Sequence, residues 1–161
     1  MDLKLVRIDS RLIHGQVVTK WVKQTGANEI IIIDDGLAKD DFMLSIYKMA
    51  APSDTPVNVR SVEDITNDWE NGSLEGKKIF VLFKDVDTAY RTYKNEFPLT
   101  KIQIGGLGSG PGKKKVYGPI YFDEKDITML TEMDQNNIDI SLQQVPEEAS
   151  LSLERALKNI K

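Results

Sequence analysis

The chain has 161 residues, of which 40% are apolar and 29% are charged, a composition typical of a globular protein with one core of ordinary size. It contains no cysteine and one histidine, which excludes a disulfide framework, thiolate chemistry and most transition-metal sites. The formal net charge of -4 has the wrong sign for a protein that binds nucleic acid through its phosphates.

The longest apolar stretches cover residues 30–33 and 79–83, far short of the roughly 20 residues that a membrane-spanning helix needs. The first four residues do not form a basic region followed by an apolar one, so no secretory signal is visible. We therefore expect a cytoplasmic protein whose association with a membrane, if any, comes through partners.

Short β-branched runs alternate with segments of helical period along the whole chain. This pattern predicts an α/β fold, with a mostly parallel central sheet of about seven strands and helices on both faces. No repeat or linker interrupts the pattern, so residues 1–161 are expected to form a single domain. The strands are predicted at residues 3–8, 29–33, 57–60, 77–83, 100–104, 119–122 and 138–144.

Local signals mark the ends of the helices between these strands. A helix over residues 15–25 should end at Gly26 in the left-handed conformation, and one over residues 39–51 should stop at the following proline. Ser61 and Asp123 are predicted to cap the starts of two more helices. Apolar residues at helical spacing mark another helix over residues 86–93 and a last one over residues 153–160, which is expected to dock on the sheet.

Binding sites in open α/β sheets lie beyond the carboxyl ends of the strands. His14 occupies such a position, in the loop between the first predicted strand and the first predicted helix. Arg7 and Arg11 can each offer a guanidinium group to phosphate oxygens, and the start of the helix offers free backbone N–H groups. A histidine beside these anion-binding groups is a candidate phosphoryl acceptor, although a loop histidine without a chemical task fits the placement equally well. The free backbone N–H groups at the start of the predicted helix are those of Gly15, Gln16 and Val17.

The glycine- and lysine-rich segment 105–115 also follows a predicted strand, but it fails both nucleotide-binding fingerprints. Leu107 and Lys114 break the Walker pattern, and Pro111 breaks the dinucleotide pattern. We interpret the segment as a flexible surface loop with a solvated lysine run. It could close over the site through Gly105, Gly106 and Leu107, or present positive charge to an acidic partner.

Carboxylates after two strands suggest a rival site. Asp34 and Asp35 follow the second strand, Asp9 follows the first and Lys84 follows the fourth, an arrangement similar to the acidic pocket and lysine of receiver-like phosphoacceptor domains. Paired carboxylates can hold magnesium, but an Asp-Asp-Gly sequence after a strand is more often a turn with helix capping. We favour turn and capping roles for this pair.

Residues 7–17, Arg-Ile-Asp-Ser-Arg-Leu-Ile-His-Gly-Gln-Val, resemble the phosphorylation-site signature of one bacterial family. This family is the enzyme IIB component of the mannose, fructose and sorbose branch of the sugar phosphotransferase system. Further segments occur in the order of the family, so the resemblance covers essentially the whole chain. These segments are residues 30–35, 78–84, 104–106, 123–126 and 143–146.

The resemblance implies a phosphotransferase in which Nδ1 of His14 takes a phosphoryl group from a phosphohistidine of enzyme IIA. The group then passes to a sugar held by the membrane components IIC and IID, which would keep the protein at the membrane surface. Arg11 and, less directly, Arg7 would clamp the phosphoryl oxygens, while Asp9 would fix the loop and the arginines. Transfer between imidazoles depends on positioning and charge neutralisation, and so needs no cofactor or divalent ion.

Several questions stay open at the level of the sequence. Ser10 stands where the family often carries an acidic residue, which affects the rigidity and the charge of the loop. By the resemblance, the transported sugar would be bound by other subunits, so the sequence does not identify it, and the chain could form a homo-oligomer. One alternative is a receiver-like switch phosphorylated on aspartate, and another is a binding module that holds a phosphorylated small molecule with the 105–115 loop.

Overall fold

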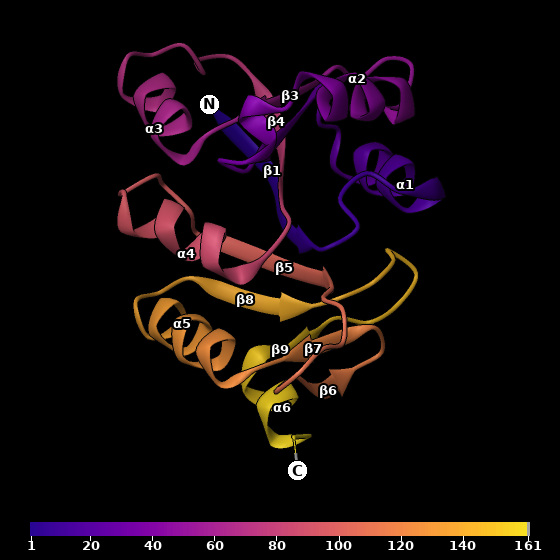
Figure 1. Cartoon of the computed structure of the whole chain (residues 1–161), viewed down its shortest axis with the longest axis vertical. Helices are drawn as coiled ribbons and strands as arrows, with labels where there is room; N and C mark the ends of the chain where they lie inside the picture. Colours follow the sequence, from indigo (N-terminus) through magenta and orange to yellow (C-terminus); the bar gives the residue numbers. More distant parts are fainter. Residues whose placement is uncertain (161) are drawn as a thin grey trace.

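The structure is a computed structural model that describes residues 1–160. Within these residues, seven strands form one sheet in the order β3-β2-β4-β1-β5-β8-β9, and β6 and β7 form a separate hairpin (Figure 1). All pairs in the sheet are parallel except β8 with β9. The strands are β1 (Asp2–Asp9), β2 (Glu29–Ile33), β3 (Val57–Arg60), β4 (Lys78–Phe83), β5 (Lys101–Gly106), β6 (Lys114–Tyr117), β7 (Ile120–Phe122), β8 (Asp139–Leu142) and β9 (Leu151–Ser152).

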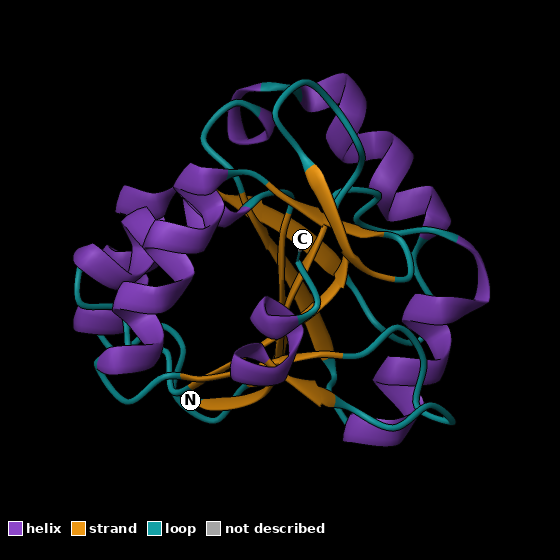
Figure 2. Ribbon diagram, turned by 90° about the horizontal axis from the view of Figure 1, so that it is seen from below, coloured by secondary structure: helices purple, strands orange, loops and turns teal. Residues whose placement is uncertain are grey.

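Helices cover both faces of the sheet, as the alternating sequence pattern predicts. Figure 2 shows the sheet between two groups of helices, and in Figure 1 α1 and α2 lie on one side and α3, α4 and α5 on the other. Among residues 1–160, no helix is both long enough and apolar enough to cross a membrane. The helices are α1 (Gly15–Thr25), the short 3₁₀ helix η1 (Leu37–Lys39), α2 (Asp41–Ala50), α3 (Val62–Glu70), α4 (Val86–Lys94), α5 (Glu124–Gln135) and α6 (Leu153–Lys158).

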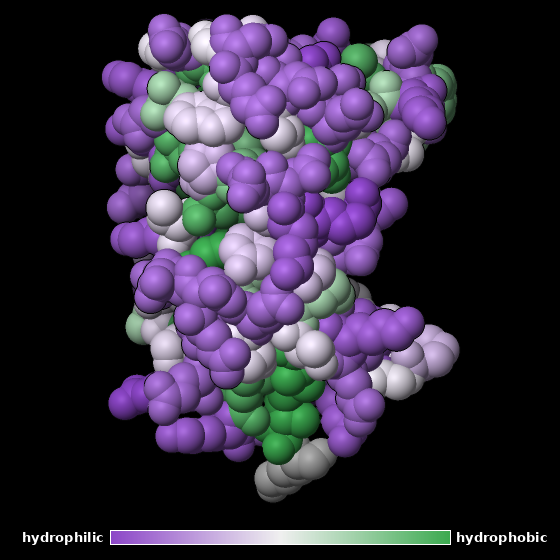
Figure 3. All heavy atoms as spheres, turned by 90° about the vertical axis from the view of Figure 1, so that its left-hand side faces the viewer, coloured by the Kyte–Doolittle hydropathy of each residue, from purple (hydrophilic) through white to green (hydrophobic). Residues whose placement is uncertain are grey.

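The core has two parts, one on each face of the sheet. Ile30 and Ile32 of β2 pack with Val18 and Trp21 of α1, whereas the alternate residues of β2 pack in the larger cluster that includes α3, α4 and α5. All five residues of β2 are buried. This explains why its sequence is continuously apolar, because a parallel strand covered on both faces has no solvent-facing side. The outer surface over α3, α4 and α5 is largely hydrophilic, with a hydrophobic area near the C-terminal end (Figure 3).

The predicted helix caps at Gly26, Ser61 and Asp123 are confirmed. Gly26 ends α1 with φ 74° and donates its N–H to the Val22 carbonyl. Ser61 accepts from the N–H of Asp64 at the start of α3, and Asp123 forms a reciprocal capping box with Asp126 at the start of α5. The predicted helix over residues 39–51 is divided, because the side chain of Asp40 caps α2 and separates it from η1.

The membership of the sheet differs from the prediction in two places. Residues 119–122 are not part of the central sheet, because β7 pairs antiparallel with β6 around a turn at Gly118, which has φ 51°. The seventh strand is instead β9, a two-residue strand antiparallel to β8. A two-residue strand is too short to show an alternation of apolar and polar residues, and β6 begins with two lysines that obscure its own alternation. Neither strand could therefore be predicted from the sequence.

Candidate active site

The candidate site lies where β1, the strand between β4 and β5, runs into α1. His14 is the residue that precedes the first turn of α1, with extended backbone angles (φ -148°, ψ 130°). Its side chain makes no capping hydrogen bond. The N–H groups of the first helical turn, which include those of Gly15, Gln16 and Val17, therefore remain available to an anion at this helix end.

The loop between β1 and α1 is fixed by its own backbone and by β5. The N–H of Leu12 donates to the Asp9 carbonyl over 2.9 Å, and the N–H of Ser10 donates to the Gly106 carbonyl, also over 2.9 Å. Leu12 has φ 55°, a left-handed conformation that costs energy for a residue with a side chain, and its side chain is buried. The loop thus has a defined shape around His14.

Asp9 holds Arg11 at the surface in a two-pronged contact. The fully buried carboxylate accepts from Arg11 Nε (3.0 Å, Oδ1) and from Arg11 Nη2 (3.0 Å, Oδ2), and Oδ1 also accepts from the backbone N–H of Arg11 (3.1 Å). The side chain of Arg11 is 41% exposed. Its guanidinium group is therefore oriented by a buried partner but can still reach a ligand from solvent.

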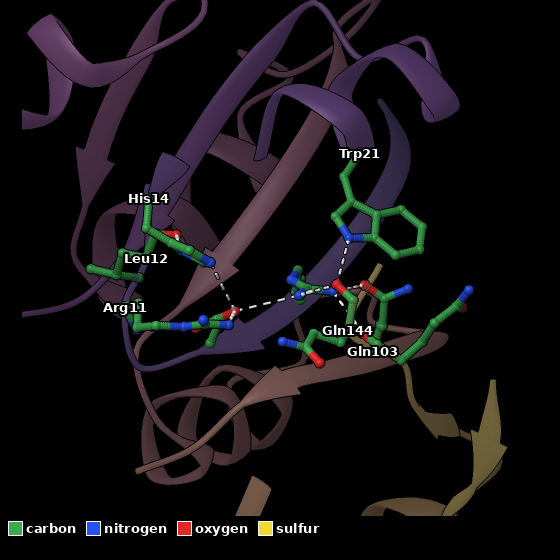
Figure 4. A network of polar contacts seen from close by, with 9 residues as sticks. Arg11, Leu12, His14, Trp21, Gln103 and Gln144 are labelled. Atoms are coloured by element: carbon green, nitrogen blue, oxygen red, sulfur yellow. Dashed lines mark hydrogen bonds and ion pairs between the residues drawn. The ribbon is translucent and has the colours of Figure 1, made fainter. Parts of the chain in front are cut away.

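The imidazole of His14 lies between the loop backbone and the same carboxylate (Figure 4). Nδ1 is 2.9 Å from the Leu12 carbonyl oxygen, and Nε2 is 3.8 Å from Asp9 Oδ2. A carbonyl oxygen only accepts, so Nδ1 carries a proton in this arrangement. Nε2 is buried without a hydrogen-bond partner among residues 1–160, although the side chain as a whole is 21% exposed.

Arg7 lies beneath the loop and is 1% exposed. Its guanidinium group donates to the backbone carbonyls of Gln143 and Gln144 (2.9 Å each), to the side-chain oxygen of Gln103 and to Asp9 Oδ2 (3.4 Å). Burial lowers the pKa of Arg7 to about 10, against the opposing effect of Asp9, so it stays charged at neutral pH. This position does not suit the predicted role of clamping phosphoryl oxygens, because the guanidinium group is buried and its Nη1 and Nη2 atoms already donate to acceptors within the protein. Arg7 instead supports Asp9.

The predicted loop residues pack against this pair of arginines. A Cβ atom on Gly105 would lie 1.9 Å from Arg7 Nη2, and one on Gly106 would lie 3.0 Å from both Arg11 Nη2 and Asp9 Oδ1. Leu107 is buried and pairs with the β6–β7 hairpin. Glycine at these two positions therefore allows the close passage of the Arg7, Arg11 and Asp9 side chains.

The lysine run that follows is not wholly solvated, contrary to the prediction. Lys113 pairs with Asp126 (2.7 Å) and Asp123 (3.4 Å), the two residues of the capping box of α5. These carboxylates raise the pKa of Lys113 although partial burial acts to lower it. The segment is tied to the body of the protein at this point.

The rival carboxylates have the turn and capping roles that the sequence favours. Asp34 Oδ1 accepts from the N–H of Leu37 (2.9 Å), while Asp35 accepts from the N–H of Val62 (2.9 Å) and from Arg91 Nη1 (2.7 Å). The bonds from Val62 and Arg91 lower the pKa of Asp35. Within residues 1–160, no three or more histidine, aspartate or glutamate side chains are grouped as metal ligands.

Sequence reasoning missed the residues that complete the network. Gln103 and the carbonyls of Gln143 and Gln144 hold Arg7, and Trp21 contributes both a hydrogen bond from Nε1 to the Gln144 carbonyl (3.2 Å) and a ring 5.4 Å from the guanidinium carbon (Figure 4). One signal was available, since a glutamine among the isoleucines of β5 marks a polar position on a buried strand.

The doubly wound sheet and the anchored histidine loop define an α/β protein with a site suited to phosphoryl groups. Residues 3–161 match the family described as the PTS (phosphotransferase) system sorbose subfamily IIB component. A sorbose-specific EIIB component from Lacticaseibacillus casei is 33% identical over 150 residues, which cover 93% of this chain and 92% of that protein. The chain therefore belongs to the IIB components of the sorbose subfamily of the sugar phosphotransferase system, which are phosphotransferases.

Two further relatives show how the chain compares in structure and in domain context. The IIBSor domain of the sorbose permease from Klebsiella pneumoniae has a TM-score of 0.92 at 30% identity, with 98% of this chain and 97% of that chain covered. The mannose-specific EIIAB component of Escherichia coli (strain K12) is 29% identical over 153 residues. That match covers 95% of this chain but 47% of the longer relative.

Proposed function

We propose that the protein is a phosphoryl carrier of a sugar phosphotransferase system and that the whole chain acts as one IIB domain. His14 would accept a phosphoryl group from a phosphohistidine of enzyme IIA and pass it to a sugar bound by the membrane components IIC and IID. The observation that carries this proposal is the position of His14 at the start of α1, with the Arg11 guanidinium held beside it by Asp9.

The surroundings of His14 indicate how Nδ1 becomes the nucleophile. In the resting arrangement Nδ1 donates to the Leu12 carbonyl, so its lone pair is not free. We infer that the ring turns away from this carbonyl and that the proton moves to Nε2 through solvent. In the resting arrangement, Asp9 Oδ2 lies 3.8 Å from Nε2, the nitrogen that carries the proton in the transfer step.

The transfer step then needs no net proton movement. The Nδ1 lone pair forms the new bond to phosphorus while the bond from phosphorus to the donor imidazole breaks, and Nε2 keeps its proton throughout. Arg11 and the open N–H groups of the first turn of α1 face the phosphoryl oxygens and offset their charge. The charge of Asp9 is itself neutralised by its bonds to Arg11 and Arg7, so it does not repel the incoming group.

The exposure of the site suits exchange between proteins. His14 and Arg11 are partly exposed, while the residues that orient them are buried. A shallow site of this kind can meet a second histidine and later a sugar hydroxyl. The mannose-specific EIIAB component of E. coli combines EIIA and EIIB in one protein, which supports enzyme IIA as the donor. Contact with IIC and IID would bring the carrier to the membrane.

The test is intact mass after incubation with phosphoenolpyruvate, the general phosphotransferase proteins and enzyme IIA. We expect one phosphoryl group that is acid-labile, alkali-stable and located on Nδ1 by ¹⁵N NMR. Transfer from purified, already phosphorylated enzyme IIA should proceed with a chelator present and without ATP. The His14→Ala variant should not be labelled, whereas the Asp35→Asn variant, altered after β2 in a turn, should be labelled normally. Full labelling of His14→Ala, or a label that hydroxylamine cleaves and magnesium requires, would contradict the proposal.

A further inference from the structure

One part of the sheet is left without a helix on one face. In β5 and β8, Ile102, Ile104, Ile140 and Leu142 point into the core that includes α4 and α5. Because side chains alternate along a strand, the opposite face carries Lys101, Gln103, Asp139 and Ser141. That is the face on which α1 and α2 cover β2 and β4. Parallel strands are normally buried on both sides, so an open polar face here is unusual.

The register places polar residues in a row across four strands of this face. Arg7 is the partner of Gln103, Gln103 of Ser141, and Ser141 of Ser152. Gln103, Ser141 and Ser152 of this row line a cavity of about 580 Å³, a size that accommodates a small ligand, and Arg7 lies next to it in the row. Leu3 and Leu5 of β1 add an apolar part to the lining.

The charge of the cavity is opposite to that of the protein as a whole. Lys4, Lys101 and Arg155 line it against one carboxylate, that of Asp139, although the chain has a net charge of -4. Lys4 is paired with Asp2, whereas Lys101 and Arg155 form no ion pair among residues 1–160. These two cations would be expected to attract an anion. The remaining polar groups are mostly hydroxyls, those of Thr100, Ser141, Ser150 and Ser152.

Gln103 connects this cavity to the candidate active site. It is 7% exposed, and its side-chain oxygen accepts from Arg7 while its nitrogen makes no hydrogen bond within residues 1–160. Arg7 in turn reaches Asp9 Oδ2, which binds Arg11. A ligand that accepts a hydrogen bond from the Gln103 nitrogen therefore acts on the residue that supports Asp9.

We propose that the cavity binds a small phosphorylated polyol, a sugar phosphate in chemical class. Its phosphate would lie between Lys101 and Arg155, and its hydroxyl groups would bond to Asp139, Gln103 and the serines of the row. Charge complementarity selects the phosphate, and the number of hydroxyl and carboxylate partners selects a polyol over a simple anion. Binding alters the environment of Arg7 through Gln103.

The test is a titration of the full chain with glucose 6-phosphate, followed by ¹H–¹⁵N NMR. We expect saturable shifts at the backbone amides of Lys101, Ser141 and Ser152 and at the Arg7 side chain. Separate titrations with glucose and with inorganic phosphate should show affinities at least about tenfold weaker, because each lacks one set of hydrogen bonds. Equal affinity for inorganic phosphate would overturn the polyol assignment.

Matched variants locate the binding. Lys101→Gln and Arg155→Gln should each weaken binding about tenfold or more, whereas Lys115→Gln, which alters an exposed lysine of β6, should bind as the unaltered protein does. Gln103→Met should abolish the shift at Arg7, and a melting curve would verify that this variant is folded. Absent shifts, or binding unchanged by Lys101→Gln, would overturn the proposal. The titration involves no phosphoryl transfer, so its outcome is independent of the role proposed for His14.

Discussion

Replacement of Gly105 by alanine is the sharpest perturbation of the arginine network. The added Cβ would lie 1.9 Å from Arg7 Nη2, 2.1 Å from its Cζ and 2.7 Å from its Nε, distances at which atoms cannot coexist. Arginine side chains are flexible, but this one is 1% exposed and bonded to four acceptors, so it has no free space to enter. Either the guanidinium group leaves its acceptors or β5 moves away from β1.

Both responses cost stability. Overpacking of a core typically costs about 1–3 kcal/mol, and the part-buried Gln143 carbonyl, left without its donor, costs about 1–3 kcal/mol more, whereas the Gln144 carbonyl keeps its bond from Trp21. Relaxation means that these costs do not add in full, and we expect a loss of about 3 kcal/mol in the free energy of unfolding. For a chain of this size that loss lowers Tm by about 6–12 °C.

Thermal and urea unfolding of Gly105→Ala, Gly106→Ala and Gly108→Ala would measure the effect. A Cβ on Gly108 meets nothing within 4 Å, so this variant controls for the alanine itself. At Gly106 the Cβ would lie 3.0 Å from both Asp9 Oδ1 and the Nη2 of Arg11, a partly exposed side chain that can swing into solvent. Gly106→Ala should therefore slow phosphoryl transfer and lower Tm less than Gly105→Ala does. Equal Tm values for Gly105→Ala and Gly108→Ala would refute the view that the path of Arg7 requires glycine.

Three further results are expected. Arg11→Lys should slow transfer from enzyme IIA about a hundredfold, and Arg11→Gln should slow it more, because a preorganised contact to a transferring group is worth about 2–4 kcal/mol. Unchanged single-turnover rates would show that Arg11 is an ordinary surface charge. The pKa of Asp35 is lowered in the fold, so its stabilisation is present above its ordinary value of 3.8 and is lost as the pH falls through the folded value. Accordingly, Tm should fall more on acidification in the unaltered protein than in Asp35→Asn, and parallel curves would disprove this. Asp123→Ala removes the cap of α5 and should lower the free energy of unfolding, measured in urea, by about 1 kcal/mol. An unchanged free energy of unfolding would show that this cap does not stabilise the protein.

The sequence predicts those parts of the fold that local physics determines. Continuous apolar runs identify the strands buried on both faces, such as β2, and the caps at Ser61 and Asp123 depend on residues three positions apart. The position of His14 at a helix start follows from the same local pattern. Short elements without a period, β9 and the β6–β7 hairpin, are determined by their partners and so could not be read from their own residues.

The role of Arg7 could not be predicted from its neighbours in the sequence. Proximity to His14 in sequence suggested that Arg7 binds phosphate, but alternation along β1 turns its side chain under the loop. Its acceptors at Gln103, Gln143 and Gln144 are 96 to 137 positions away, and no local pattern connects them. An arginine between the apolar residues Val6 and Ile8 was the available sign that it is buried and paired.

The place of β1 in the middle of the sheet has a consequence for the phosphoryl transfer proposed for His14. The histidine loop continues a strand with neighbours on both sides and is held by backbone bonds from Ser10 and Leu12, so little ordering is left to be done on contact. The loop then acts as a preformed template, and the speed of encounter depends on orientation and charge and not on a slow folding step. Under the function proposed for His14, donor and acceptor would fit the same template in turn, so their binding would be mutually exclusive and two different proteins would share one complementary shape.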